Sequence, residues 1–439
     1  MLDRSTPPQV SEFKPLSIFP QQITELHPGI TLHAIDGGTL PVNKLIVAWQ
    51  YGDVQASAHA TDASQTTACL ASARLVPAMM LEGSAQRSGA RIAEEVAFRG
   101  AWTGAGMSSD FASISLLSMN STTPELIPVL ADVLAHPTMP EQTFANMRRA
   151  RAVQAQLASR QVASVAQAAV RTLLCGHAHP YGRILTADDV MTASRPLALE
   201  AASTGLRAMP VHIFVGGALS SSLMGAVHSL ADNIHGMRQG TAPIIPAPPV
   251  SYSPEAPQTV HTDVPGALQG AVSIAQPVGV PRASDDYIPL RLAVMALGGY
   301  FGSRLMQNVR ERLGLTYGIS AALMGSAEGT AIVIDAQCDA ANFGRVIAET
   351  RREMEALATQ PMPDDEFRRL RQYAASQLAG TVGSPLAIAD HYYSNLTIGA
   401  PADYYGRQWQ ALQALTPESL RDVAPRHFRP DDLLIATAG

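Results

Sequence analysis

Charge, and lysine in particular, is scarce in this chain. Charged residues make up 15% of the 439 residues, whereas about a quarter is usual for globular domains. The only lysines are Lys14 and Lys44. Two explanations stay open: a surface largely covered by another subunit, or an alanine-rich, arginine-biased genome. The net charge is −6 and no basic block is present, which argues against nucleic-acid binding and against attraction to an anionic membrane surface.

Long apolar runs and a cysteine framework are also missing. No run in the sequence reaches the roughly 18 apolar residues of a membrane span. Cys69, Cys175 and Cys338 are scattered and form neither a disulfide framework nor a zinc-ribbon spacing. Residues 1–8 have no apolar core, so no signal peptide is predicted there. The polar tail that follows resembles a mature secreted N-terminus. We expect a periplasmic protein if a signal peptide was removed, and a cytoplasmic one otherwise.

The length and the proline distribution predict two domains. With 46% hydrophobic residues, the chain can form two cores of roughly 200 residues each. Six prolines between Gly240 and Gln258 resist helix and sheet and predict a semi-rigid extended linker. The predicted domains are an N-terminal tail (1–28), an N-terminal lobe (29–239), the linker (240–258) and a C-terminal lobe (259–439).

The two halves repeat each other. Met-Pro-Glu-Gln-Thr-Phe at 139–144 opens a helical run, and Met-Pro-Asp-Asp-Glu-Phe opens another at 362–367. In both copies proline stands at a helix start and acidic residues follow it, which suits the positive end of the helix dipole. Similar strands precede both motifs and similar apolar strands close both halves, at 110–117, 329–336, 212–216 and 433–439. We therefore predict a duplicated α+β domain.

The histidines do not form a helical zinc-peptidase motif. Such a site needs two histidines four residues apart with a carboxylate between them, and none of the twelve histidines has a partner at that spacing. Cys175, His177 and His179 lie close together, but they would need a fourth ligand that the sequence does not supply. His228 and His235 are seven residues apart, which is typical of a solvated or core pair on one helix.

The stretch from Gly298 to Tyr317, GGYFGSRLMQNVRERLGLTY, resembles the second-half signature of the insulinase/pitrilysin-like zinc peptidases, the family that includes mitochondrial processing peptidase. The resemblance extends from about Gly29 to Gly439. It implies an α+β fold in which two homologous α/β sandwich-like lobes form half of a clam-shaped peptidase chamber. The family's chamber admits unfolded peptides or small segments.

The resemblance also locates the zinc site that this chain lacks. The family's His-x-x-Glu-His precedes a run that matches residues 79–84 here. Counting back, the two ligand positions are Arg74 and Ala78, and the general-base position is Pro77. The third ligand, a glutamate, is expected near 153–157, which reads Val-Gln-Ala-Gln-Leu. None of these residues can hold zinc, so we expect no metal in this chain.

Two structural expectations accompany this loss. The apolar pattern at Leu70, Leu75 and Met79 predicts that the helix itself is kept. In the family, an extended substrate adds a strand to a sheet edge beside the zinc. The matching stretch, 101–109, contains two glycines and few large side chains, and we interpret it as vestigial.

Arg310 and Tyr317 match the arginine and tyrosine that the family carries at this spacing. There the pair reaches across to a zinc site, holds the substrate backbone and stabilises the tetrahedral intermediate. A phenol and a guanidinium suit that role, because negative charge develops on the carbonyl oxygen. A helix from Ser303 is expected to end at Gly314, with Tyr317 beginning the next strand. Of the neighbouring residues, Arg304 is expected to pair internally, Arg312 to lie off the face of Arg310 and Glu311 to serve the helix surface or an interface.

The resemblance implies a catalytically incomplete subunit of a heterodimeric zinc metalloendopeptidase, not active alone. A homologous partner would supply the zinc, and this chain would supply Arg310 and Tyr317 and help select unfolded peptides or small proteins. The alternatives are a non-catalytic scaffold, like the core subunits of respiratory complexes, or a peptide-binding module without an enzyme partner.

Overall fold

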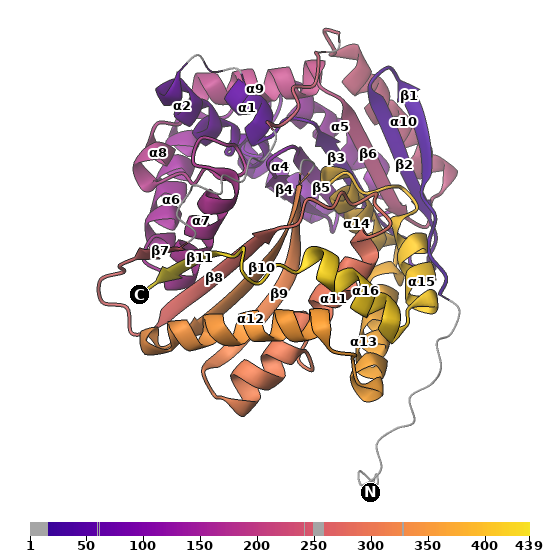
Figure 1. Ribbon diagram of the computed structural model, residues 1–439. Helices are drawn as coiled ribbons and strands as arrows, with labels where there is room; N and C mark the ends of the chain where they lie inside the picture. The colour runs from indigo at the N-terminus through magenta and orange to yellow at the C-terminus, as the bar shows by residue number, and fades with distance from the viewer. Residues whose placement is uncertain (1–15, 59, 61, 241, 249–258, 327–328) are drawn as a thin grey trace, which may run out of the picture.

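A computed structural model describes residues 16–58, 60, 62–240, 242–248, 259–326 and 329–439. It contains two β-sheets, each accompanied by its own helices (Figure 1). The first part of the predicted tail and most of the predicted linker, including 249–258, lie outside the described residues. No helix in the described ranges is both long and apolar enough to cross a membrane.

The N-terminal sheet has the strand order β1-β2-β6-β3-β5-β4, with β2 and β6 parallel and the other pairs antiparallel. Its strands are β1 (Gln22–His27), β2 (Ile30–Asp36), β3 (Val42–Trp49), β4 (Trp102–Met107), β5 (Ala112–Met119) and β6 (Val211–Gly217). The helices of this half are α1 (Asp53–Ala58), α2 (Ala63–Ala73), α3 (Val76–Met80), α4 (Gly89–Phe98), α5 (Thr123–Ala135), α6 (Glu141–Ala158), α7 (Val162–Cys175), α8 (Ala187–Met191), α9 (Arg195–Ala208) and α10 (Ser221–Gly236).

The C-terminal sheet has the order β7-β11-β8-β10-β9. Its strands are β7 (Thr259–Thr262), β8 (Gly270–Pro277), β9 (Thr316–Ser326), β10 (Gly329–Cys338) and β11 (Leu434–Ala438). The helices are α11 (Tyr287–Gly298), the π-helix η1 (Met306–Arg312), the 3-10 turn η2 (Ala340–Asn342), α12 (Phe343–Thr359), α13 (Asp364–Val382), α14 (Pro385–Thr397), α15 (Tyr404–Ala414) and α16 (Pro417–His427).

The strand orders confirm the duplication predicted from the sequence. The order β6-β3-β5-β4 in the first sheet recurs as β11-β8-β10-β9 in the second. Pro140 and Pro363 of the repeated motif are the N-caps of α6 and α13, and acidic residues occupy the first turn of both helices. The dipole of each helix favours those carboxylates. The α+β fold with two homologous lobes is therefore present, and each lobe contributes one sheet.

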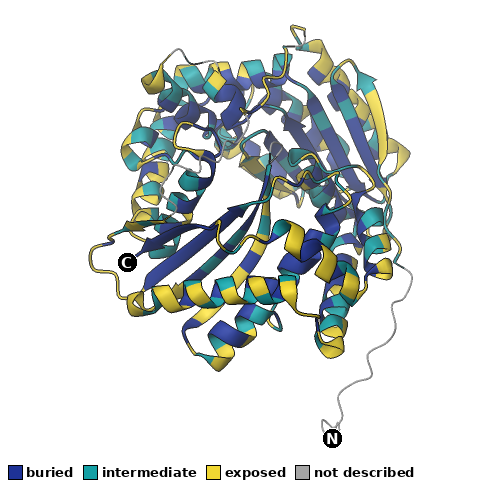
Figure 2. Ribbon diagram, viewed as in Figure 1, coloured by how far each residue is buried: buried dark blue, intermediate teal, exposed yellow. Residues whose placement is uncertain are grey.

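Each lobe contributes a helix that packs against the sheet of the other lobe. Side chains alternate between the two faces of a strand. Leu45 and Val47 accordingly lie in the core of the N-terminal lobe, whereas Ile46 and Phe214 join the C-terminal core. That second face of the N-terminal sheet packs against α14 of the other lobe. In return, α7 of the N-terminal half packs against β8 and β11, and buried positions line both sheets (Figure 2).

Glycine is required where α14 meets the N-terminal sheet. A Cβ atom at Gly216 of β6 would lie 2.3 Å from the backbone oxygen of Pro385 in α14. A side chain there would force the helix away from the sheet, because neither backbone can move without breaking its own hydrogen bonds.

A pair of neutral histidines lies on the same interface. His33 of β2 contacts His212 of β6 through Nε2 and Nδ1, which are 3.1 Å apart, and stacks on Phe214. Its other ring nitrogen is 3.1 Å from Oε1 of Gln21. Burial lowers the pKa of both histidines to about 4, and for His33 the neighbouring His212 contributes further. Both imidazoles are therefore uncharged at neutral pH.

Candidate functional site

The helix that would carry a zinc motif is interrupted. The prediction of one kept helix is wrong, because α2 ends at Ala73 and α3 begins at Val76. Pro77 lies in the first turn of α3 and has no N–H to donate to the carbonyl of Ala73 four residues earlier. The backbone resolves this by stopping one helix and starting another, since a missing donor costs nothing in a first turn.

An ion pair occupies the first of the two zinc-ligand positions predicted from the resemblance. The guanidinium of Arg74 donates from Nε and Nη2 to the two carboxylate oxygens of Asp53 in α1, at 3.0 and 2.9 Å. The Asp53 side chain is 9% exposed and that of Arg74 is 33% exposed. Burial and the nearby charge of Arg74 lower the pKa of Arg171 in α7, with Asp53 acting in the opposite direction. The site is thus cationic, and unsuited to a second cation such as zinc.

The other zinc-site positions offer no ligand either. Pro77 is buried and Ala78 is half-buried in α3. The third-ligand stretch lies on α6, where Val153 and Leu157 are 54% and 56% exposed. Among the described residues, no group of three or more histidine, cysteine, aspartate or glutamate side chains could hold a metal ion.

Two of the histidines that the sequence analysis did not assign to a metal site, His179 and His235, have other partners in the fold. His179 has both ring nitrogens engaged, Nε2 with the carbonyl of Pro248 at 2.7 Å and Nδ1 with the backbone N–H of Tyr181 at 3.1 Å. His235 stacks on His27 with ring centroids 4.3 Å apart, so these two form a packed pair.

Replacing Arg74 with alanine is expected to lower the free energy of unfolding by roughly 1–3 kcal/mol, because the buried carboxylate of Asp53 loses its partner. The measurement is urea denaturation. Arg345→Ala, at an exposed arginine of α12, is the control and should change little. The double variant Arg74→Ala/Asp53→Asn should lose less unfolding free energy than the sum of the losses in the two single variants. A loss equal to that sum would contradict a direct interaction between Arg74 and Asp53.

Arg310 lies on η1, whose i→i+5 hydrogen bonds widen the turn. The backbone N–H of Leu313 donates to the carbonyl of Asn308, five residues earlier. Gly314 has φ +60°, the left-handed conformation that suits glycine at a helix end. The helix end predicted at this glycine is confirmed, whereas its π geometry was not foreseen. Such π segments are rare and often occur at functional sites.

The Arg310 guanidinium is held at the surface by an aromatic ring. Its Cζ lies 5.0 Å from the ring centroid of Phe301, a side chain that is 61% exposed. Its Nε is 3.5 Å from a carboxylate oxygen of Glu311. The neighbours behave differently: Arg304 forms a largely buried two-point contact with Glu366, as predicted, and Arg312 bonds to Asn308. Among these three arginines, Arg310 is the one not tied to a buried partner.

Tyr317 lies one residue into β9, as predicted, and its side chain is 86% exposed. It lines a groove of about 520 Å³ between α7 and the C-terminal sheet. Polar groups in this groove include Gln167 of α7 and Asp335 of β10, whose carboxylate accepts a hydrogen bond from Ser273 at 2.6 Å. The phenol is therefore available to a ligand in the groove or to another molecule.

The structure brings together some of the predicted site residues and separates others. Arg310 and Tyr317 lie on η1 and β9, which pack against each other. Arg74, Pro77 and Ala78 lie in the other lobe, and in the described part of the chain η1 and β9 make no substantial contact with α2 or α3. Within this chain, Arg310 and Tyr317 therefore lie apart from the zinc positions predicted at Arg74, Pro77 and Ala78.

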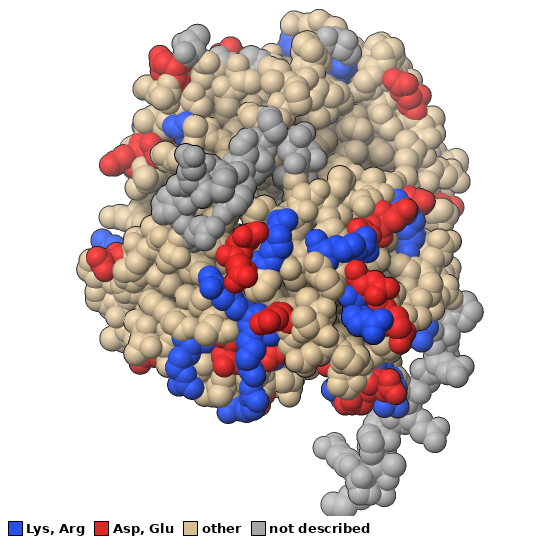
Figure 3. Space-filling model, in the orientation of Figure 1, with Lys and Arg blue, Asp and Glu red and all other residues tan. Residues whose placement is uncertain are grey.

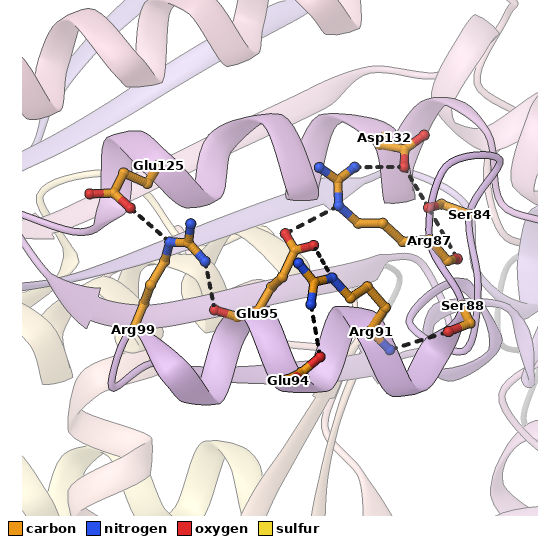
Figure 4. A network of polar contacts seen from close by, with 9 residues as sticks. All are labelled: Ser84, Arg87, Ser88, Arg91, Glu94, Glu95, Arg99, Glu125 and Asp132. Carbon is orange, nitrogen blue, oxygen red and sulfur yellow. Dashed lines mark hydrogen bonds and ion pairs between the residues drawn. The ribbon is translucent and has the colours of Figure 1, made fainter.

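The stretch 101–109 contains β4, the outermost strand of the N-terminal sheet. The helix before it is fixed to α5 by a polar network (Figure 4): Arg87 bonds to Glu95 and Asp132, and Arg99 bonds to Glu125. Trp102 on this strand is 67% exposed. The backbone edge of β4 is thus held in place and open to pairing.

Charge is distributed unevenly over the molecular surface. In the view of Figure 3, acidic and basic side chains gather over the C-terminal half, while the N-terminal lobe above shows few. Large apolar side chains are exposed in the N-terminal lobe, and Phe98 of α4 is 87% exposed. The charged side chains visible in this view are therefore concentrated over the C-terminal half.

Comparison with known proteins agrees with the fold. Residues 219–373 match the family described as Peptidase M16 inactive domain. An uncharacterized zinc protease of Streptomyces coelicolor is 28% identical over 162 residues. That match covers 36% of this chain and 34% of the relative, so only about a third of the curated protein is spanned.

Three solved structures have the same fold. A peptidase M16 inactive domain from Pseudomonas fluorescens superposes with a TM-score of 0.81 at 22% identity, over 95% of this chain and 98% of that one. The periplasmic protease PqqL from Escherichia coli gives 0.77 at 13%, over 100% of this chain and 47% of PqqL. A chain of complex III2 from Candida albicans gives 0.73 at 14%, over 95% of each. These findings agree with the resemblance read from the sequence: residues 219–373 match an M16 domain family, and nearly the whole chain has the fold of M16 structures.

Proposed function

We propose that this chain is the zinc-free subunit of a heterodimeric zinc metalloendopeptidase. In this proposal, Arg310 and Tyr317 reach into the active site of a homologous partner that carries His-x-x-Glu-His and its zinc. The observation that carries the proposal is the Tyr317 side chain, 86% exposed on a groove, in a strand that packs against the helix carrying Arg310 and its stacked Phe301 ring. A large exposed side chain with an unused hydroxyl suits a group that acts on another molecule.

The chemistry requires both chains. Hydrolysis of a peptide bond at zinc places negative charge on the carbonyl oxygen, where a fixed phenol and guanidinium can donate hydrogen bonds. This chain offers those donors but, with Arg74 paired to Asp53, no ligand set for zinc among the described residues. The substrate class would be unfolded peptides or small proteins. The likeness to the periplasmic protease PqqL favours the periplasm as the compartment.

The test is a peptidase assay on unfolded peptides with this chain alone, a co-encoded His-x-x-Glu-His chain alone, and the two mixed. Activity confined to the mixture and abolished by a chelator would support the proposal. Full activity of the partner alone, unchanged by mixing, would contradict it and favour a scaffold, a role consistent with the fold shared with a complex III chain.

Phe301 is expected to position Arg310. Phe301→Leu should lower kcat/KM of the mixed enzyme by roughly two- to fivefold, because an exposed cation–π contact contributes about 0.5–1 kcal/mol. Phe301→Tyr should retain activity. Phe98→Leu, at an exposed phenylalanine of the other lobe, is the control. Equal activity of Phe301→Leu and wild type would remove Phe301 from the site.

A further inference from the structure

A second cavity lies inside the C-terminal lobe, apart from the groove at Tyr317. It has a volume of about 420 Å³, is partly open, and is lined mainly by α11, α13, α14 and α15. No residue lines both this cavity and the Tyr317 groove. Its size falls within the range of small-molecule sites. The proposed peptidase chemistry does not use it.

Two arginines without acidic partners line this cavity. The Arg282 guanidinium lies 5.0 Å from the ring centroid of Tyr287 and against Gly325, and its Nε is buried without a hydrogen bond to any described residue. Arg291 of α11 lines the cavity and forms no ion pair or hydrogen bond within the described ranges. None of the lining residues is acidic. Two such cations in a partly enclosed space create a positive potential that favours an anion.

The remaining polar groups offer further hydrogen-bond donors. Asn395 of α14 is 7% exposed, and its side-chain amide interacts with the hydroxyl of Tyr405. Burial raises the pKa of Tyr405 and lowers that of His391. Both groups are therefore uncharged at neutral pH, so the phenol of Tyr405 does not offset the positive charge of the arginines. Because an amide group carries two N–H donors, Asn395 can also donate a hydrogen bond to a ligand oxygen.

Apolar side chains form the rest of the wall. Ile288 and Leu292 of α11 and Leu378 of α13 line the cavity and are themselves at least nine-tenths buried. A ligand would therefore need an apolar body as well as a charged end. An inorganic anion alone would leave these walls unfilled.

We propose that this cavity binds a small amphipathic carboxylate, with its carboxylate at Arg282, Arg291 and Asn395 and its apolar body against the α11 and α13 side chains. Arginine's planar donor fork matches a carboxylate, and charge-assisted hydrogen bonds of this kind are strong. The carboxylate could belong to the C-terminus of a short peptide or to a non-peptide acid, since both present the same chemistry.

The test is calorimetric titration of the full chain with two acids and their amides. The probes are N-acetyl-leucyl-phenylalanine, 4-phenylbutyrate and the corresponding carboxamides. We expect at least one acid to bind roughly tenfold or more tightly than its amide. The peptide and non-peptide arms distinguish the two sources. Equal affinity for acid and amide, or no binding of either acid, would overturn the proposal.

Variants locate the binding. Arg291→Gln and Arg282→Gln should each weaken binding of the acid by roughly tenfold and leave the amide unchanged. Arg345→Gln, at an exposed arginine of α12, is the matched control and should bind like wild type. Unchanged affinity in both cavity variants would also overturn the proposal. If a variant unfolds, the affinities of the wild-type chain for the acid and for its amide decide whether the proposal holds.

Discussion

Replacing Tyr317 with phenylalanine is expected to reduce turnover by the mixed enzyme roughly 10²-fold, because one oxyanion donor is lost. The side chain is 86% exposed and lies at the start of β9. Removing its hydroxyl therefore leaves the lobe's packing unchanged, and folding and pairing with the partner should be intact. The loss should appear mainly in kcat, since the donor acts where charge develops in the transition state.

The measurement is steady-state kinetics on an unfolded peptide, with complex formation checked by size-exclusion chromatography. Tyr373→Phe is the control, because Tyr373 stacks on Tyr300 elsewhere in the same lobe and has no proposed role in catalysis. Unchanged turnover in the Tyr317→Phe heterodimer would remove this residue from the mechanism.

Acidification is expected to destabilise the chain through His33 and His212. Their pKa values are about 4 in the fold and near 6.5 when unfolded, so the unfolded chain takes up protons first as the pH falls. Their contribution to stability is complete above pH 6.5 and is lost as the pH falls toward 4. Linkage predicts a loss of about 4 kcal/mol between pH 7 and pH 5 for the two groups together.

Urea denaturation at both pH values measures this loss. The double variant His33→Gln/His212→Gln should be less stable at pH 7 but should lose much less stability on going to pH 5. His177→Gln, at an exposed histidine, should retain the wild-type pH dependence. A pH dependence identical in the double variant and wild type would show that these histidines do not carry the effect.

The structural features that depend on short local sequence patterns were predicted from the sequence. The repeated Met-Pro motif located α6 and α13, and the positions of Gly314 and Tyr317 gave the helix end and strand start around the candidate site. Proline caps and a left-handed glycine act on their immediate neighbours, so a single sequence reveals them.

The sequence did not reveal what depends on packing between distant segments. The apolar pattern suggested an unbroken zinc-site helix, although Pro77 alone, through its missing N–H, was a signal for the break. Nothing in the residues around Asp53 indicates its pairing with Arg74, which needs α1 and α2 to meet. The exchange of α7 and α14 between lobes and the meeting of Arg282 with Arg291 in one cavity likewise arise only in the folded chain.

The central claim is that Tyr317 lies in a partner's zinc site, and the most direct test is to detect it there. A fluorinated tyrosine placed at position 317 can be followed by ¹⁹F NMR in the heterodimer, with the partner's zinc exchanged for paramagnetic Co²⁺. The account predicts strong cobalt-dependent broadening or shift of this signal, and none for the same label at Tyr373. An active heterodimer whose Tyr317 signal is the same with cobalt and with zinc would contradict the account.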